Sequence, residues 1–180
     1  MVMVKTEIVN VVATASLGQQ IDFEELRKFK EIFHDSDVYG GRVAYFKTEK
    51  MQGKVSIFNT GKMISVGTKS EAQAFHELEM AMEFLAERGS VKPVKLDPQI
   101  RNIVAVTDFE KSMNLETLSM ESKAIYEPEQ FPGAILRLEK PYKTSILIFA
   151  SGKAVITGLK SSKQIEPIIE QLKEIVDKNQ

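Results

Sequence analysis

Cysteine is absent from the 180 residues, and so is any excess of positive charge. Without cysteine the chain has no disulfide, no thiolate metal site and no cysteine nucleophile, which is typical of the reducing cell interior. Lysine and arginine number 24 against 25 aspartates and glutamates. This balance does not indicate a nucleic-acid partner, although a basic surface can still lie on one side of a neutral molecule.

Long apolar segments are missing as well. No stretch reaches the roughly 18 uninterrupted apolar residues from which a membrane span is predicted. The N-terminal segment MVMVKTEIVNVVATASLG is the one candidate signal peptide, but Lys5, Glu7 and Asn10 interrupt it. A similar segment recurs deep inside the chain, so we expect no signal peptide. With 43% apolar residues to form a core, the chain is predicted to be a globular, cytoplasmic protein.

The chain contains an internal repeat. IVNVVAT at residues 8–14 resembles IRNIVAV at 100–106, and IFNTGKMISVGTKS at 57–70 matches IFASGKAVITGLKS at 148–161 at seven of fourteen positions. Two collinear matches indicate a tandem duplication with a period too long for a solenoid. We therefore predict two half-domains, residues 1–92 and 93–180, joined through SVKPVKLDP. The two matching segments are separated by one residue more in the first copy than in the second. This predicts one extra residue in the first copy, in the loop around Lys50 to Lys54.

Hydrophobic periodicity predicts the elements of each copy. Alternation in IVNVVAT, KVSIF, KMISVG, AILRLE and SILIF is typical of strands, with turns at residues 59–61 and 151–152. A helix is predicted over residues 22–33 with Asp22 as its N-cap. Further helices begin at Ser70 and Ser161, where a glutamine three residues on completes a capping box. These elements predict an α+β fold with two helices per copy, all on one side of an antiparallel sheet.

Because the helices cover one face of the sheet, the other face is predicted to be open. Strand parity places on it Asn10, Val12, Ile64, Val66, Asn102, Val104, Val155 and Thr157, with Lys62 and Lys153 in phase. Alternatively these residues form a sandwich core and the asparagines cap turns. One asparagine at the same point of both copies favours a binding surface, because its amide can donate to adenine N3 and thymine O2 in the DNA minor groove.

The segment from Tyr126 to Ser161 resembles the second-repeat signature of TATA-box-binding proteins of the archaeal type almost without interruption. With NVVAT, NIVAV and the repeat itself, the likeness spans nearly the whole chain. It implies a saddle-shaped, pseudo-twofold fold, with a long curved sheet on DNA and four helices on the convex face. It also implies a non-enzymatic, nucleoid-associated initiation factor without metal, cofactor, small-molecule substrate or membrane. Its implied partners are TATA-box duplex DNA, transcription factor B and, indirectly, RNA polymerase.

The resemblance also implies roles for individual residues. It adds the wedge positions Phe131, Phe149, Phe58 and Tyr39, the apolar contact Ile135, and the phosphate contacts Arg137, Lys153, Lys160, Lys62 and Lys69. The family is itself a known example of aromatic wedges in the minor groove. Glu127 and Glu129, in the loop that resembles the family's C-terminal stirrup, match contacts to transcription factor B.

The first copy departs from this signature. HDSDVYGG stands where the second copy has YEPEQFPG, Tyr45 stands for Arg137, and Val66 stands for Thr157. A tyrosine cannot neutralise a phosphate and a valine cannot form a hydrogen bond. These changes predict that the first copy grips and distorts DNA less strongly than the second.

Two other kinds of function are alternatives for this sequence. An enzyme is disfavoured because SGK lacks the spacing of a phosphate-binding P-loop, and His34 and His76 have no matched nucleophile or metal-ligand cluster. A sheet that binds a protein or single-stranded RNA is the stronger alternative. Such RNA-binding sheets display aromatic residues in mid-strand, whereas valine, isoleucine and asparagine dominate here.

Overall fold

The computed structural model describes residues 4–178 as two compact units, one of residues 10–101 and one of residues 102–178 together with residues 4–9. The elements in chain order are β1 (Lys5–Ser16), η1 (Glu24–Leu26), β2 (Ile32–His34), η2 (Tyr39–Gly41), β3 (Val43–Phe46), β4 (Lys54–Phe58), β5 (Lys62–Thr68), α1 (Glu71–Glu87), β6 (Gln99–Asp108), α2 (Leu115–Glu121), β7 (Gly133–Leu138), β8 (Thr144–Phe149), β9 (Lys153–Leu159), η3 (Ser162–Gln164) and α3 (Ile165–Lys178). The three η elements are short 3-10 helices.

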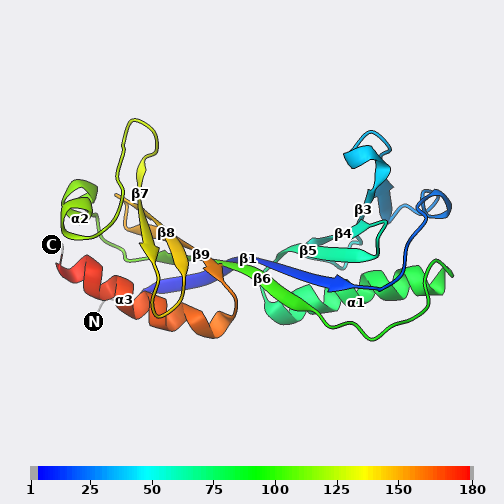
Figure 1. Cartoon of the computed structure of the whole chain (residues 1–180). Helices are drawn as coiled ribbons and strands as arrows, with labels where there is room; N and C mark the ends of the chain where they lie inside the picture. Colours follow the sequence, from blue (N-terminus) through cyan, green and yellow to red (C-terminus); the bar gives the residue numbers. More distant parts are fainter. Residues whose placement is uncertain (1–3, 179–180) are drawn as a thin grey trace. The chain divides into compact units, whose positions relative to one another are not determined.

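Each unit is built on an antiparallel sheet. The strand order is β2-β3-β4-β5-β1 in the unit of Asn10–Arg101 and β6-β9-β8-β7 in the other unit. A long strand, a meander of three strands and a closing helix follow one another in both copies (Figure 1). This succession confirms the predicted α+β tandem repeat.

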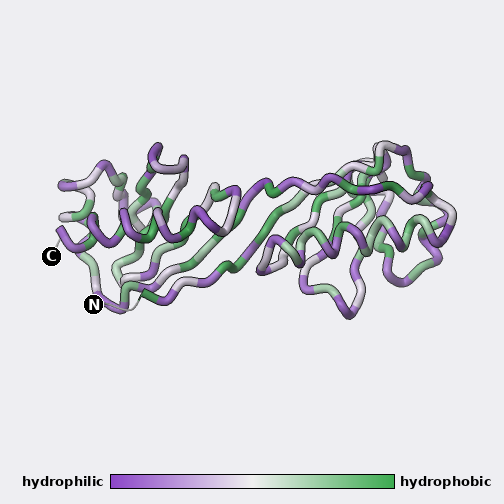
Figure 2. Tube along the Cα trace, turned by 90° about the horizontal axis from the view of Figure 1, so that it is seen from below, coloured by the Kyte–Doolittle hydropathy of each residue, from purple (hydrophilic) through white to green (hydrophobic). Residues whose placement is uncertain are grey.

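The helices bury one stripe each. In α1, which packs on β4 and β5, Ala74, Leu78, Ala81 and Leu85 are fully buried at helical spacing. Ser70 caps this helix by accepting a hydrogen bond from the Gln73 N–H at 3.1 Å, as the capping box predicts. Figure 2 shows apolar and polar residues interleaved along the helices and strands of each unit. Among residues 4–178 no helix is both long and apolar enough to cross a membrane.

The predicted helix over residues 22–33 is wrong. The chain forms only the 3-10 turn η1 there and then extends into β2, so the described residues form three α-helices instead of four. Asp22 accepts from the Glu24 N–H at 3.0 Å, which closes a tight turn and not a helical N-cap. Pairing of Ile32 with Phe46 and of Phe33 with Tyr45 on β3 then draws the segment into the sheet. In the second copy the helix does form, as α2, capped by Asn114.

Candidate functional site

One face of the sheet in each unit is left half-exposed. The eight residues predicted to share this face, namely Asn10, Val12, Ile64, Val66, Asn102, Val104, Val155 and Thr157, are all partly accessible. Their strand neighbours Met63, Ser65, Ile103, Ala154 and Ile156 are fully buried on the helical side. The strand parity deduced from sequence therefore holds in both units. Lys62 and Lys153 are exposed at the starts of β5 and β9, in phase with these residues.

An asparagine side chain caps a β-bulge in each unit. Asn10 Oδ1 accepts a hydrogen bond from the Gly67 N–H, and Asn102 Oδ1 accepts one from the Gly158 N–H, both at 2.8 Å. The two glycines have φ of +97° and +91°, where a side chain would be strained, and the strand registers shift at this point. Since an N–H can bond only to the amide oxygen, each NH₂ group remains free to donate.

This arrangement combines the two roles that the sequence allows for the asparagines, a cap of the backbone and an amide donor on a binding surface. The asparagines do cap irregular backbone, and the capping bond fixes which way each amide points. On the same face Val12 pairs with Val66, and Val155 pairs with Leu147. The site thus presents one oriented amide donor per unit within a β-branched, apolar strand surface.

The second stirrup (residues 126–132) carries a closely packed aromatic pair at its base. Phe131 and Phe149 lie edge to face with ring centroids 5.8 Å apart. Gly133 pairs with Phe149 across the strands. A Cβ at Gly133 would lie 2.8 Å from Phe131 Cε1 and 3.2 Å from Phe149 Cε1, so only glycine lets the rings approach in this way.

The tip of the second stirrup exposes its two carboxylates. The N–H groups of Gln130 and Phe131 both donate to the Glu127 carbonyl oxygen at 2.9 Å, which closes the turn. The side chains of Glu127 and Glu129 are exposed and make no hydrogen bond or ion pair with any residue in the described range 4–178. The stirrup projects beyond the strands of its unit (Figure 1).

The first stirrup (residues 34–42) does not reproduce the aromatic pair. Phe58 faces Val43, whose side chain fills the place that Gly133 leaves open in the second copy. Tyr39 is 69% exposed and has φ of 50°, a strained value for a residue other than glycine. Within residues 4–178 it makes no ring contact with Phe58.

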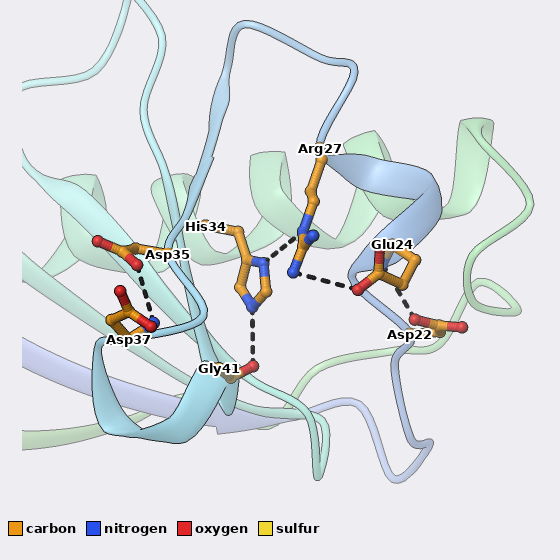
Figure 3. A network of polar contacts seen from close by, with 7 residues as sticks. All are labelled: Asp22, Glu24, Arg27, His34, Asp35, Asp37 and Gly41. Atoms are coloured by element: carbon orange, nitrogen blue, oxygen red, sulfur yellow. Dashed lines mark hydrogen bonds and ion pairs between the residues drawn. The ribbon is translucent and has the colours of Figure 1, made fainter.

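His34 closes the base of the first stirrup (Figure 3). Its Nδ1 accepts from Arg27 Nε at 2.9 Å, and its Nε2 lies 2.8 Å from the Gly41 carbonyl oxygen. A guanidinium can only donate, so Nδ1 is the acceptor and Nε2 carries the proton that binds Gly41. Arg27 is held in turn by Glu24 at 3.1 Å. The first stirrup is therefore a braced loop with its own internal contacts.

The strand registers correct the assignment of Tyr45. Counted from the phenylalanine that ends β4 or β8, Tyr45 is the counterpart of Ile135, and the residue in the place of Arg137 is Lys47. Burial agrees, because Tyr45 and Ile135 are half-buried whereas Lys47 and Arg137 are exposed. The apparent loss of a cation in the first copy came from aligning the loops without their length difference.

The same registers correct the position of the extra residue. Phe33 pairs with Tyr45 twelve positions on, whereas Ile125 bridges Ile135 ten positions on, so the first stirrup is two residues longer than the second. The loop around Lys50 to Lys54 is, by register, one residue shorter than its counterpart. The prediction of an insertion in that loop was wrong. Length changes concentrate in surface loops because the strands that flank them must keep their pairing.

Two further observations bear on the predicted polar contacts. Thr157 Oγ1 donates to the Ser145 carbonyl oxygen at 3.0 Å, so its proton is used inside the sheet and its difference from Val66 is smaller than predicted. The cationic side chains predicted to contact phosphate, Lys62, Lys69, Arg137, Lys153 and Lys160, are all exposed. Within residues 4–178 no group of three or more His, Asp and Glu side chains is placed to hold a metal ion.

Sequence reasoning missed two residues of this face. Phe33 is 62% exposed on the edge strand β2 and stacks on Tyr45, and Lys54 extends its ammonium over the same Tyr45 ring. Phe33 was missed because its segment was predicted to be a helix and not a strand of the sheet. The residue type at position 54 carried no signal, because a lysine at the start of a strand is common on any protein surface.

Comparison with known proteins places this geometry in a family. The family model described as transcription factor TFIID, or TATA-binding protein, matches residues 5–88 and 97–179, one segment per repeat. The TATA-box-binding protein of Cenarchaeum symbiosum is 39% identical over 163 residues, covering 89% of this chain and 88% of that protein. The TATA-box-binding protein of Pyrobaculum aerophilum is 36% identical over 167 residues, covering 92% and 82%.

The fold agrees with a solved member. The structure titled Methanococcus jannaschii TBP superposes with a TM-score of 0.84 at 29% identity, covering 97% of this chain and 99% of that one. Two copies of one module, an oriented asparagine in each and a matching solved fold lead to one conclusion. The chain belongs to the TATA-box-binding protein family and has the role of a general transcription factor.

Proposed function

We propose that the half-exposed faces bind the minor groove of A·T-rich TATA-box promoter DNA. One observation carries the proposal: Asn10 and Asn102 lie on the half-exposed face, and each has its amide oxygen bound internally, which leaves its NH₂ group free to donate. A·T pairs offer only the acceptors adenine N3 and thymine O2 in the minor groove. Guanine adds an amino group to the minor groove. This group is a hydrogen-bond donor, so it cannot bond to the asparagine NH₂, which is also a donor. The names of the relatives, TATA-box-binding proteins, support the same ligand.

The other face residues take the roles expected of a protein that bends the groove. Val12, Ile64, Val66, Val104, Ile135 and Val155 press on sugars and base edges, Phe131 and Phe149 wedge between bases, and Lys62, Lys69, Arg137, Lys153 and Lys160 neutralise phosphates. Phe58 and Tyr39 act in the first repeat, where the strained, exposed Tyr39 contributes less. The repeats, read as residues 1–92 and 93–180, each cover half of the promoter element. Support comes from the face these residues share in each unit and from the exposure of the cations.

We further propose that Glu127 and Glu129 recruit transcription factor B, and through it RNA polymerase, in the nucleoid. Both carboxylates are exposed and unpaired within the described residues. An unpaired anion on a projecting turn is suited to steer a basic partner surface.

Fluorescence anisotropy with three labelled probes tests the DNA proposal: a TATA duplex, a G·C duplex and the TATA single strand. We expect tightest binding to the TATA duplex, with an affinity that falls steeply as salt rises because several cations displace counterions. Tighter binding to the single strand would favour the single-strand alternative. An affinity indifferent to both sequence and salt would exclude minor-groove readout by this face.

A further inference from the structure

The edge of the first unit carries a ladder of two aromatic rings and one cation on the candidate face. Phe33 of β2 stacks on Tyr45 of β3, with ring centroids 6.3 Å apart and planes 28° from parallel. Lys54 of β4 places Nζ 4.5 Å from the centroid of the Tyr45 ring. Three neighbouring strands therefore each contribute one side chain to a continuous surface, here called the edge ladder.

The registers place the edge ladder beside the residues proposed to face the bases. Tyr45 pairs with Ser56, and Ser56 pairs with Ile64. Lys54 pairs with Val66, which pairs in turn with Val12. Side chains directly opposite one another across antiparallel strands lie on the same face. The edge ladder thus extends the candidate face outward to the edge strand β2.

The second repeat has nothing similar in the corresponding places. By register Phe33 corresponds to Ile125, Tyr45 to Ile135 and Lys54 to Ser145. Two aliphatic side chains and a serine thus stand where the first repeat has two rings and a cation. The cation of the second repeat, Arg137, lies on the neighbouring strand β7.

Lys47, the counterpart of Arg137 in the first repeat, already donates hydrogen bonds within the protein. Lys47 Nζ donates to the carbonyl oxygens of Met51 and Gln52 at 2.9 Å each, and also to that of Gly53. Its ammonium therefore braces the β3–β4 loop. Lys54 has no acidic partner in the described part of the chain, and its ammonium lies over the Tyr45 ring.

We propose that the edge ladder is a DNA-backbone site, in which Lys54 binds one phosphate and the rings of Phe33 and Tyr45 cover the adjoining deoxyribose. This inference rests on the proposed function, since it extends the same DNA-binding face. A phosphate suits an unpaired ammonium, and a 62% exposed phenylalanine on an edge strand suits an apolar sugar face. The first repeat thereby has a cation for the DNA backbone on β4, while Lys47, the counterpart of Arg137, is engaged in the β3–β4 loop.

Replacement by the residue of the second repeat gives the sharpest test. Lys54→Ser should weaken binding of the TATA duplex about eightfold at ~0.1 M salt and reduce the slope of log K against log salt by about 0.9, the value for one phosphate. Lys54→Arg should keep the slope. Lys50→Ser is the matched control, because Lys50 lies near Glu83 and Phe84 of α1, on the helical side. Phe33→Ile and Tyr45→Ile should weaken binding without changing the slope.

Neutral methylphosphonate linkages, placed one at a time along the TATA duplex, locate the contact. At one position, the neutral linkage should weaken binding of the wild-type protein but not binding of Lys54→Ser. Combining the protein change with the DNA change in this way measures the interaction between Lys54 and that phosphate. If the wild type binds with a steep salt dependence and Lys54→Ser alters neither affinity nor slope, the edge ladder is not a DNA site. If the wild type itself fails to bind TATA duplex, the proposed function fails first, which is a separate result.

Discussion

Asn102→Asp tests base readout with the least disturbance to the fold. An aspartate keeps an oxygen in the place of Oδ1, which accepts from the Gly158 N–H at 2.8 Å, so the β-bulge stays capped. The change removes only the NH₂ donor that the internal bond leaves free, and it adds a negative charge. Substitution of a buried or capping asparagine usually weakens binding and folding together, so the two losses cannot be distinguished. Here the aspartate can still accept the bond from the Gly158 N–H, so a loss of binding is expected without a loss of folding.

The expected loss follows from what the amide donates. A base contact of this kind discriminates by about 1–3 kcal/mol, and the carboxylate meets acceptor atoms in place of a donor. Binding of TATA duplex should therefore fall roughly 5- to 150-fold, since each 1.4 kcal/mol is about tenfold. Binding of a G·C duplex should fall less, because the guanine amino group can donate to the carboxylate. The ratio of the two affinities is the quantity that reports base readout.

Asn114→Asp provides the control for the chemistry of the substitution. Asn114 also uses its Oδ1 to accept a backbone N–H, that of Thr117 at 3.0 Å, but it caps α2. Anisotropy titrations with both duplexes, together with thermal melting of each variant, complete the design. Equal losses on the TATA and G·C duplexes for Asn102→Asp, at an unchanged melting temperature, would refute the assignment of the amide to base contact.

Three further predictions concern the stirrups. Glu129→Arg should leave the affinity for TATA duplex within about twofold, but it should impair assembly of the ternary complex with transcription factor B in a gel shift. The reason is that the change reverses only one exposed charge on the stirrup. Unchanged assembly would contradict the proposed contact. Phe131→Ala should reduce the DNA bend, measured by energy transfer between end labels, more than Tyr39→Ala does, because Tyr39 lacks an aromatic partner; equal straightening contradicts the asymmetry. Gly133→Val should separate the Phe131–Phe149 rings and reduce bending as Phe131→Ala does, with wild-type bending as the contrary result.

Strand parity and the repeat were accessible to sequence reasoning because both depend on local periodicity. Side chains alternate along a strand whatever it pairs with, so Asn10 and Asn102 were placed on the open face without knowledge of the sheet. The capping boxes at Ser70 and Ser161 were likewise local signals. At Ser161 the helix begins with a 3-10 turn, and Gln164 Oε1 reaches back to the Lys160 N–H at 2.7 Å.

The errors arose where non-local pairing decides the structure. The segment of residues 22–33 has apolar residues at helical spacing, but strand pairing with β3 overrides that local preference. Aligning Tyr45 with Arg137 assumed stirrups of equal length, and only the pairing registers reveal that the first is longer. The capping bonds of the asparagines also depend on a bulge glycine more than fifty residues away in sequence.

The corrected register changes the comparison between the two repeats. The repeats are alike in their amide donors, because each presents one asparagine held by the same bond to a bulge glycine. They differ at the periphery, where the first repeat has the edge ladder and a braced, longer stirrup, and the second has Arg137 and the paired rings of Phe131 and Phe149. Identical donors read A·T pairs equally well in either direction. Under the proposed function, any preference of this chain for one orientation on a promoter must therefore come from residues in which the repeats differ, such as Val66 and Thr157, since the asparagine pair supplies none.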